Sequence, residues 1–264
     1  MTAKPHEDLH RAALELIAAA QRGRSVLTAF KKLCPQIYRQ VRQDARFPGL
    51  LALWGRCVNF DENARQTIVH PAILRALGEL AGIPVRGNIV HAGLQHTYGY
   101  LFSVIETPYG FKRDRWVSDD LERGLGVERS LLGERPVAGT LLANATWVLG
   151  HVAFRDEPRQ RAALQRQAKA VAPELVEYDF DALNVERIVE RVNRRRDVSI
   201  VTDLVTLPHA PTGDRLLVYS VAVGRAPRRL VTAFPVRPEV AKALLTAANT
   251  SDVQLKYNAY VRDV

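Results

Sequence analysis

Cysteine is scarce in this chain, which has only two, Cys34 and Cys57, among 264 residues. Two cysteines are too few for the disulfide framework of a secreted scaffold. Both are flanked by apolar residues in stretches with helical periodicity, so we expect buried, reduced thiols. The first eight residues are polar and mixed in charge, without the apolar core of a secretory signal. The sequence therefore predicts a cytoplasmic protein.

Long apolar runs and the common cofactor motifs are also missing. No apolar run approaches the ~20 residues that a membrane-spanning helix needs, so we expect no membrane association. The chain contains no Gly-rich phosphate loop, no Gly-x-Ser-x-Gly elbow, no paired cysteines at zinc spacing and no His-Glu-x-x-His pattern. We therefore expect neither a cofactor nor a metal.

The residues that are abundant point to a folded, basic protein. Hydrophobic residues make up 47% of the chain, which is enough for a sizeable core. The formal charge is +9, and the excess arginines are spread along the chain. A basic balance favours anionic partners, which leaves an anionic small molecule or a nucleic acid. The alternative is that the arginines reflect only the base composition of the genome.

The first third of the chain has helical periodicity. Apolar residues recur at helical spacing, and Ser25, Pro35 and Gly82 mark helix ends. The predicted helices cover residues 7–21, 25–34, 36–46, 50–58 and 71–81. In the third of these, Arg39, Arg42 and Arg46 share one face. This arginine row suits phosphate contacts or an ordinary solvated helix face.

From residue 85 onward the pattern changes to alternation with inserted helices. The predicted strands cover residues 97–106 and 111–117 (a hairpin), 139–154, 198–207, 215–223, 228–236 and 254–261. The predicted helices cover residues 158–172, 183–193 and 238–248. The sequence thus predicts an α+β fold, with a helical N-terminal third packed on a mainly antiparallel sheet. We expect a helical segment at 1–84 and an α+β domain at 85–264, or one continuous domain.

The stretch from His91 to Trp116 holds the densest mixture of titratable and aromatic residues. On a strand, His96 would share a face with Tyr98 and Tyr100, because side chains alternate with period two. A histidine there exchanges protons near neutral pH, and a tyrosine can stabilise developing negative charge. The predicted catalytic residues are His96, Tyr98 and His91. The alternative is that this face packs against the helical layer.

Further polar residues in or near this stretch are candidates for holding an anionic substrate. Arg115 suits a carboxylate or phosphate because its guanidinium carries a fork of donors. The alternative is a cross-strand ion pair between a basic residue and Glu106, and such pairs usually stabilise a hairpin only modestly. The predicted substrate-binding residues are Tyr100, Glu106, Arg115, Lys112, Asn144 and His151. A three-imidazole metal site of His91, His96 and His151 is a weaker alternative.

Three functions remain open at this point. The first is a metal-independent hydrolase or lyase that acts on an anionic small molecule through histidine and tyrosine acid–base chemistry. The second is a nucleic-acid-binding protein or ribonuclease, which would use the arginine row and the run Arg194 to Arg196. The third is a regulatory or scaffold protein whose helical third docks a partner.

Overall fold

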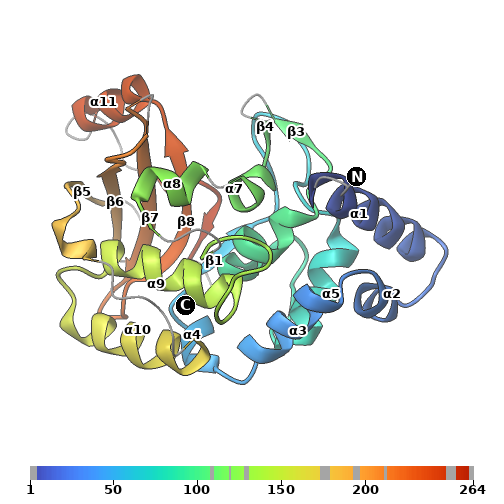
Figure 1. Cartoon of the computed structure of the whole chain (residues 1–264). Coiled ribbons are helices and arrows are strands. Elements are labelled where there is room, and N and C mark those ends of the chain that lie inside the picture. The colour runs from blue at the N-terminus through green and yellow to red at the C-terminus, as the bar shows by residue number, and fades with distance from the viewer. Residues whose placement is uncertain are drawn as a thin grey trace.

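The fold places a group of N-terminal helices beside a C-terminal four-stranded antiparallel sheet (Figure 1). The predicted α+β class is confirmed. The computed structural model describes residues 5–107, 110–118, 120–127, 131–172, 179–192, 197–210, 213–247 and 254–261. The run Arg194 to Arg196 lies outside these ranges.

Four of the predicted N-terminal helices are confirmed, with small shifts at their ends. The helical segments here are α1 (Pro5–Gln21), α2 (Val26–Leu33), α3 (Pro35–Asp44), the short α4 (Pro48–Leu51) and α5 (Pro71–Ala81). The Ser25 hydroxyl caps α2 by accepting a bond from the Thr28 amide. Gly82 ends α5 in the left-handed conformation, at φ 69°.

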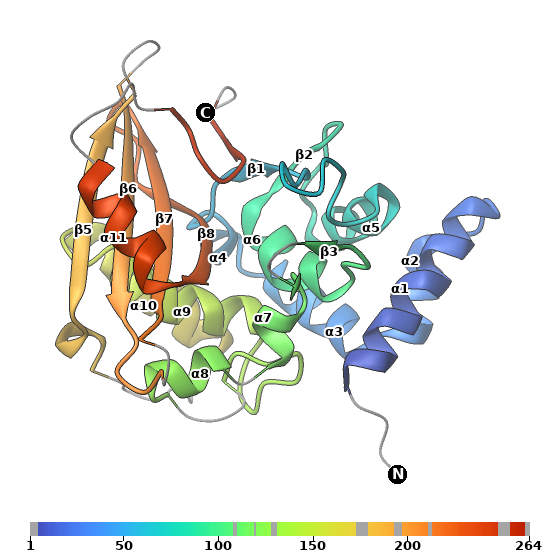
Figure 2. The same ribbon diagram turned by 90° about the horizontal axis from the view of Figure 1, so that it is seen from above.

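The C-terminal sheet is an antiparallel meander with strand order β5-β6-β7-β8. Its strands are β5 (Val185–Arg191), β6 (Val198–Thr206), β7 (Arg215–Val223) and β8 (Arg229–Val236), and α11 (Pro238–Ala247) follows. The buried helix α9 (Leu141–Ala153) packs against β6, β7 and β8, and α10 (Pro158–Val171) packs against α9. Figure 2 shows this sheet and the N-terminal helices on opposite sides of the molecule.

Residues 53–58 connect the two parts through backbone hydrogen bonds. The Leu230 amide in β8 donates to the carbonyl of Leu53, and the Gly55 amide donates back to the carbonyl of Leu230. Immediately afterwards β1 (Arg56–Val58) pairs with β2 (Ile89–His91) and with β9 (Ala259–Tyr260). The predicted helix at 50–58 is therefore wrong beyond Leu51, and the predicted strand at 254–261 is shorter than expected.

Trp54 fixes this connection from the inside. Its side chain is 2% exposed, and its indole nitrogen donates to the Thr146 hydroxyl of α9 at 2.8 Å. On its other side lies Gly93, in the short helix α6 (Ala92–Leu94). A Cβ atom at Gly93 would lie 2.8 Å from Trp54 Cγ, so only glycine allows this approach.

The predicted hairpin of 97–106 and 111–117 is mostly wrong. The π-helix η1 (Gln95–Gly99) follows α6, and only β3 (Glu106–Thr107) and β4 (Gly110–Phe111) pair as strands. The chain then forms α7 (Asp114–Val117) and α8 (Asp120–Leu125). Every residue from Ala92 to Ser103 is buried, and a helix that is buried on all sides carries no helical stripe in its sequence.

Two other predicted segments have the opposite type of secondary structure. The predicted strand at 139–154 is the helix α9, whose thirteen residues are all buried. The predicted helix at 183–193 is β5, which follows the short 3-10 helix η2 (Phe180–Ala182). The sequence of β5, Val-Glu-Arg-Ile-Val-Glu-Arg, places Val185, Ile188 and Val189 at positions i, i+3 and i+4, which is helical spacing.

The expected division at residue 84 is crossed by both hydrogen bonds and apolar packing. β1 pairs with β2 and β9 across it, and a connected set of buried apolar side chains runs from Leu9 to Ala241. The division itself stays a prediction.

Across the described ranges, no helix combines the length and the apolar character that crossing a bilayer requires.

A buried polar network joins α3, η1 and the start of α9. Both Asp44 oxygens accept bonds at 2.6 Å, one from the Tyr98 hydroxyl and one from the Thr140 hydroxyl. Gln40 accepts from the Leu141 amide at 2.8 Å. Asp44 is completely inaccessible, and burial raises its pKa to about 7, although the two hydroxyl bonds act in the opposite direction.

This network predicts a pH-dependent effect of Asp44→Asn. Because the pKa of folded Asp44 is raised, its stabilising contribution is complete below the unfolded pKa and is lost as pH rises towards about 7. The variant cannot ionise. The free energy of unfolding of Asp44→Asn minus that of the wild type should therefore increase between about pH 4 and 7 and level off above. Urea titrations measure it. A flat difference, or one equal to that of the exposed control Asp197→Asn, would contradict the account.

The close approach of Gly93 to Trp54 predicts that Gly93→Ala destabilises the fold. In a helix this substitution normally stabilises, by up to about 1 kcal/mol. Here the added methyl meets the indole, and a loss of about 1–3 kcal/mol is expected. Gly133→Ala is the control, since its Cβ would meet nothing closer than 3.9 Å. Equal unfolding midpoints for the two variants would show that the indole yields easily.

Candidate functional site

The candidate site lies where η1, α7 and β8 meet, between the helical part and the sheet (Figure 1). His96 comes from η1 and Tyr100 follows it, their rings 4.6 Å apart. Arg115 comes from α7 and lies over the Tyr100 ring, 5.2 Å from its centre. Three of the predicted residues are thus brought together, although not by the predicted hairpin.

The π-helix is what sets this arrangement. The Tyr100 amide donates to the Gln95 carbonyl, a bond five residues long that widens the helix by one residue. The carbonyl of His96 accepts the indole N–H of Trp116, which ties α7 to η1. Such π segments are rare in proteins, and those that occur are often found at functional sites. Here the segment holds Arg115 beside His96.

His96 is buried and neutral. Its side chain is 4% exposed, and Nδ1 is 3.1 Å from the Thr232 hydroxyl of β8. Nε2 is inaccessible and has no hydrogen-bond partner among the described residues. Burial, followed by the positive charges of Arg115 and Lys112, lowers the pKa of His96 well below its ordinary value. The free chain therefore favours the neutral ring more than an exposed histidine would, and the acid–base role of His96 stays a prediction.

Among the described residues, no carboxylate pairs with Arg115. The residue as a whole is partly buried, and its Nη1 is inaccessible and has no hydrogen-bond partner within the described ranges. The guanidinium lies between two aromatic rings, at 5.2 Å from the centre of Tyr100 and 5.7 Å from that of Phe234. Burial lowers the pKa of Arg115, which shows how poorly its charge is solvated. Ring contacts compensate only partly for lost water.

The carboxylate of Asp61 is the counterion that lies close to the site, and it serves another cation. Asp61 Oδ2 lies 3.2 Å from Lys112 Nζ, while Oδ1 accepts from the backbone amides of Asn63 and Ala64. These bonds hold the pKa of Asp61 below its ordinary value in spite of burial. Lys112 and Asp61 cancel each other, so the positive charge of Arg115 is left over.

The sequence analysis missed Gln95, Thr232 and Asp61. Gln95 is 1% exposed; its side chain bonds to Tyr100, and its Oε1 has no partner among the described residues. Thr232 reaches the site from β8, far along the chain. The only signal in the sequence for Gln95 is its position next to His96. Nothing in the sequence links residue 232 to residue 96.

The other predicted catalytic residues have structural roles. Tyr98 points away from His96 and donates to Asp44, so the shared tyrosine face does not exist. His91 caps α6: Nδ1 accepts from the Leu94 amide, and Nε2 donates to the Leu51 carbonyl at 2.9 Å. Burial lowers the pKa of His91 to about 4. With both ring nitrogens bound to backbone, His91 has none left for a substrate.

The remaining predicted substrate contacts lie elsewhere. Glu106 is exposed on β3, opposite Phe111. Asn144 donates to the carbonyls of Leu131 and Ala138, and so anchors a loop against α9. His151 donates from Nδ1 to the Trp147 carbonyl at 2.8 Å and stacks on Phe180. Within the described ranges, no three histidine, cysteine or acidic side chains gather as metal ligands.

Comparisons of the chain with models of protein families, with curated proteins and with solved structures found no match. The geometry of the site is therefore the basis for its interpretation.

A second partly buried arginine has the carboxylate partners that Arg115 lacks among the described residues. Arg187 of β5 binds both oxygens of Asp203, at 2.6 and 3.1 Å, and a third bond joins it to Asp156. It also donates to the Val152 carbonyl near the end of α9. Burial lowers the pKa of Arg187, but its bonds to Asp203 and Asp156 outweigh this and raise it overall.

The two arginines predict opposite effects of the same substitution. Arg187→Met leaves Asp203 buried without a partner and should lower the free energy of unfolding by about 3–5 kcal/mol. Arg115→Met removes an uncompensated charge and leaves no carboxylate behind, so stability should stay within about 1 kcal/mol or increase. Urea unfolding of both variants measures this. A large loss for Arg115→Met would mean that its charge has a partner in the free protein.

Proposed function

We propose that this chain binds a small anionic molecule at Arg115 and His96, and that it acts on that molecule as a hydrolase or lyase. The observation that carries the proposal is that Arg115 Nη1 and His96 Nε2 are inaccessible and unpartnered among the described residues, and that both side chains lie against the Tyr100 ring. A buried donor without a partner costs about 1–3 kcal/mol, and more when it is charged. A site that keeps such groups is suited to a ligand that supplies the missing acceptors.

The chemistry of the lining defines the ligand class. The guanidinium offers a planar pair of donors, which matches a carboxylate or a phosphate. The rings of Tyr100 and Phe234 cover its faces and leave its edge for the anion. The ligand is thus a small molecule with at least one anionic group.

His96 is the proposed acid–base group. Its Nδ1 is occupied by Thr232, so Nε2 is the nitrogen that remains for a substrate. A bound anion opposes the positive charges that depress the pKa of His96, so binding returns the ring towards a useful pKa. Tyr100 lies beside both groups, where its hydroxyl can stabilise negative charge on the reacting oxygen. No step in this proposal needs a metal or a nucleotide.

Anions should stabilise the wild type but not Arg115→Met. At ten times the dissociation constant a ligand adds about 1.4 kcal/mol to the free energy of unfolding. For a chain of this size that is roughly 3 to 5 °C in Tm. Thermal shift with inorganic phosphate, sulfate, and di- and tricarboxylates, each matched in ionic strength with sodium chloride, measures the effect. Arg225→Met, at an exposed arginine in the turn between β7 and β8, is the control.

Two results would contradict the proposal. Stabilisation by every anion in proportion to ionic strength would indicate general screening, and an equal response of Arg115→Met would place the anion elsewhere. The enzymatic part has its own test, because His96→Gln should still bind a stabilising anion. A stabilising anionic metabolite should be converted by the wild type and not by His96→Gln, with products followed by mass spectrometry. Binding without conversion in the wild type would reduce the function to binding.

A further inference from the structure

A separate basic surface lies along α3, away from the site of Arg115. It forms a shallow groove of about 520 Å³, lined by Tyr38, Arg39, Arg42, Gln43, Arg46 and Phe47. We call this set the α3 groove. Arg39 and Arg42 belong to α3, and Arg46 follows in the turn after the helix ends at Asp44. The three arginines of the predicted row thus line one open groove.

The charge of the α3 groove is not neutralised by the protein. Arg39, Arg42 and Arg46 are exposed, and within the described ranges none of them forms an ion pair or a hydrogen bond. No carboxylate lines the groove. Asp44 belongs to the same helix but points into the core, where Tyr98 and Thr140 bind it. Three uncompensated positive charges therefore face solvent over about two helical turns.

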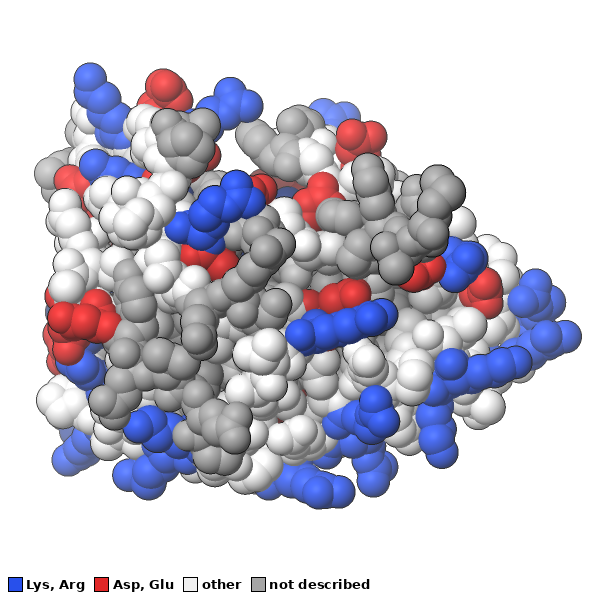
Figure 3. Space-filling view, viewed as in Figure 1, with Lys and Arg blue, Asp and Glu red and all other residues white. Residues whose placement is uncertain are grey.

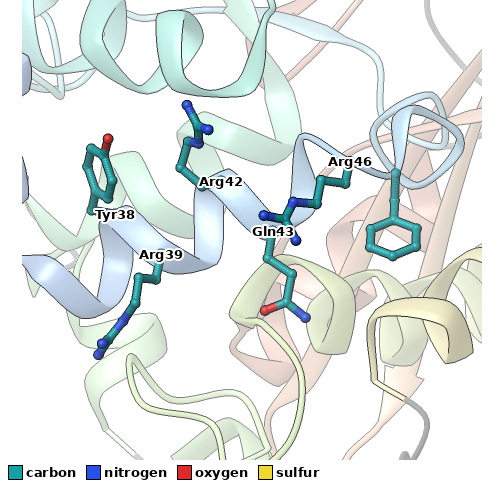
Figure 4. A pocket seen from close by; sticks show the side chains of 6 residues that line it. Tyr38, Arg39, Arg42, Gln43 and Arg46 are labelled. Carbon is teal, nitrogen blue, oxygen red and sulfur yellow. The ribbon is translucent and has the colours of Figure 1, made fainter.

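The directions of the three arginine side chains favour an extended anion over a compact one. In Figure 4 the side chains of Arg39 and Arg42 point to opposite sides of α3, and Arg46 lies beyond the end of the helix, in the turn that follows Asp44. They do not converge on one point, as they would around a single phosphate or carboxylate. An anion with charges repeated along its length can contact all three. A nucleic-acid backbone is such an anion.

Positive charge continues from the α3 groove onto α10. Gln43 donates to the Val171 carbonyl at the end of α10, which joins the two helices directly. Arg159 and Arg166 of α10 are exposed as well. In Figure 3, blue side chains follow the lower edge of the molecule, where Figure 1 places α10 and α3, and red side chains lie higher.

Two aromatic side chains favour a single strand. Tyr38 and Phe47 line the α3 groove near its two ends, and each is partly exposed. Unstacked bases can pack on such rings, whereas paired bases inside a duplex cannot. A membrane surface fits less well, because it would need large exposed apolar side chains to insert. The exposed ones, Leu14, Val137, Val189 and Val240, do not line the groove.

We propose that the α3 groove binds single-stranded nucleic acid, with Arg39, Arg42 and Arg46 on the phosphates and Tyr38 or Phe47 stacked on a base. This surface is independent of the anion site at Arg115. It adds a polymeric partner to the small molecule proposed above, and neither proposal depends on the other.

The test is a titration of the full chain with a fluorescein-labelled RNA strand of about 12 nucleotides. Fluorescence anisotropy is recorded between about 0.05 and 0.3 M salt, and the slope of log K against log salt is taken. The triple variant Arg39→Gln, Arg42→Gln, Arg46→Gln should lower the slope by about 2, because each phosphate contact on a single strand contributes about 0.7. Its affinity at about 0.1 M salt should fall at least roughly tenfold.

Matched variants separate this surface from general charge. Arg191→Gln, Arg225→Gln, Arg237→Gln removes three exposed arginines on the sheet side and should keep most of the wild-type slope. Arg39→Lys, Arg42→Lys, Arg46→Lys keeps the charge and should keep the slope too. Circular dichroism confirms that each variant is folded. Tyr38→Leu should weaken binding of the single strand by roughly fivefold and leave duplex binding unchanged.

Several outcomes would overturn the proposal. They are no binding by the wild type at the lowest salt, an equal loss in the two glutamine triple variants, and stronger binding to a duplex than to the single strand. Binding of phosphatidylserine vesicles in preference to the strand would assign the surface to membranes. Displacement of the strand by millimolar inorganic phosphate would assign it to small anions. An equal affinity for DNA and RNA strands supports the proposal, since the contacts are to phosphate and base faces.

Discussion

The buried contact of Trp54 with Gly93 and Thr146 is the constraint on which the rest of the arrangement depends. Residues 53–58 bond to β8 on one side and to β2 and β9 on the other, so they set the distance between sheet and helices. Trp54 fixes that segment against α9, and the missing side chain of Gly93 lets α6 approach. Because η1 continues directly from α6, the position of His96 follows from the position of Trp54.

Once that geometry is set, the electrostatics of the site follow from its contacts. Thr232 and Phe234 lie two residues apart on β8, and therefore on one face of the strand, where they meet His96 and Arg115. Asp61 pairs with Lys112, and no other described carboxylate serves Arg115 as a counterion. The contrast with Arg187, which binds two carboxylates, shows that the fold can supply acceptors where they serve stability. At Arg115 the neighbours are the aromatic rings of Tyr100 and Phe234, an arrangement that suits a site left open for a ligand.

The sequence predicted most elements that carry a periodic stripe or clear turn signals, and it missed two helices that are buried on every side. The helices α1 to α3, α5 and α10 and the strands β6 to β8 show stripes or strong turn signals. By contrast, η1 and α9 are buried all round, and their β-branched and aromatic residues imitate strands. The sequence analysis named His96 and Arg115 as site residues, but the hairpin on which it placed them is not the structure that brings them together. Their proximity arises from a π-helix and from the bond of Trp116 to His96, which periodicity does not reveal.

The central claim is that an external anion completes the site of Arg115 and His96. The most direct measurement is a pH titration of the histidine ring signals by NMR, with the His96 signal assigned from the spectrum of His96→Gln. Without ligand, the pKa of His96 should lie well below its ordinary value, and a saturating stabilising anion should raise it. A His96 ring that titrates near its ordinary pKa without ligand, and that an anion does not affect, would contradict the account.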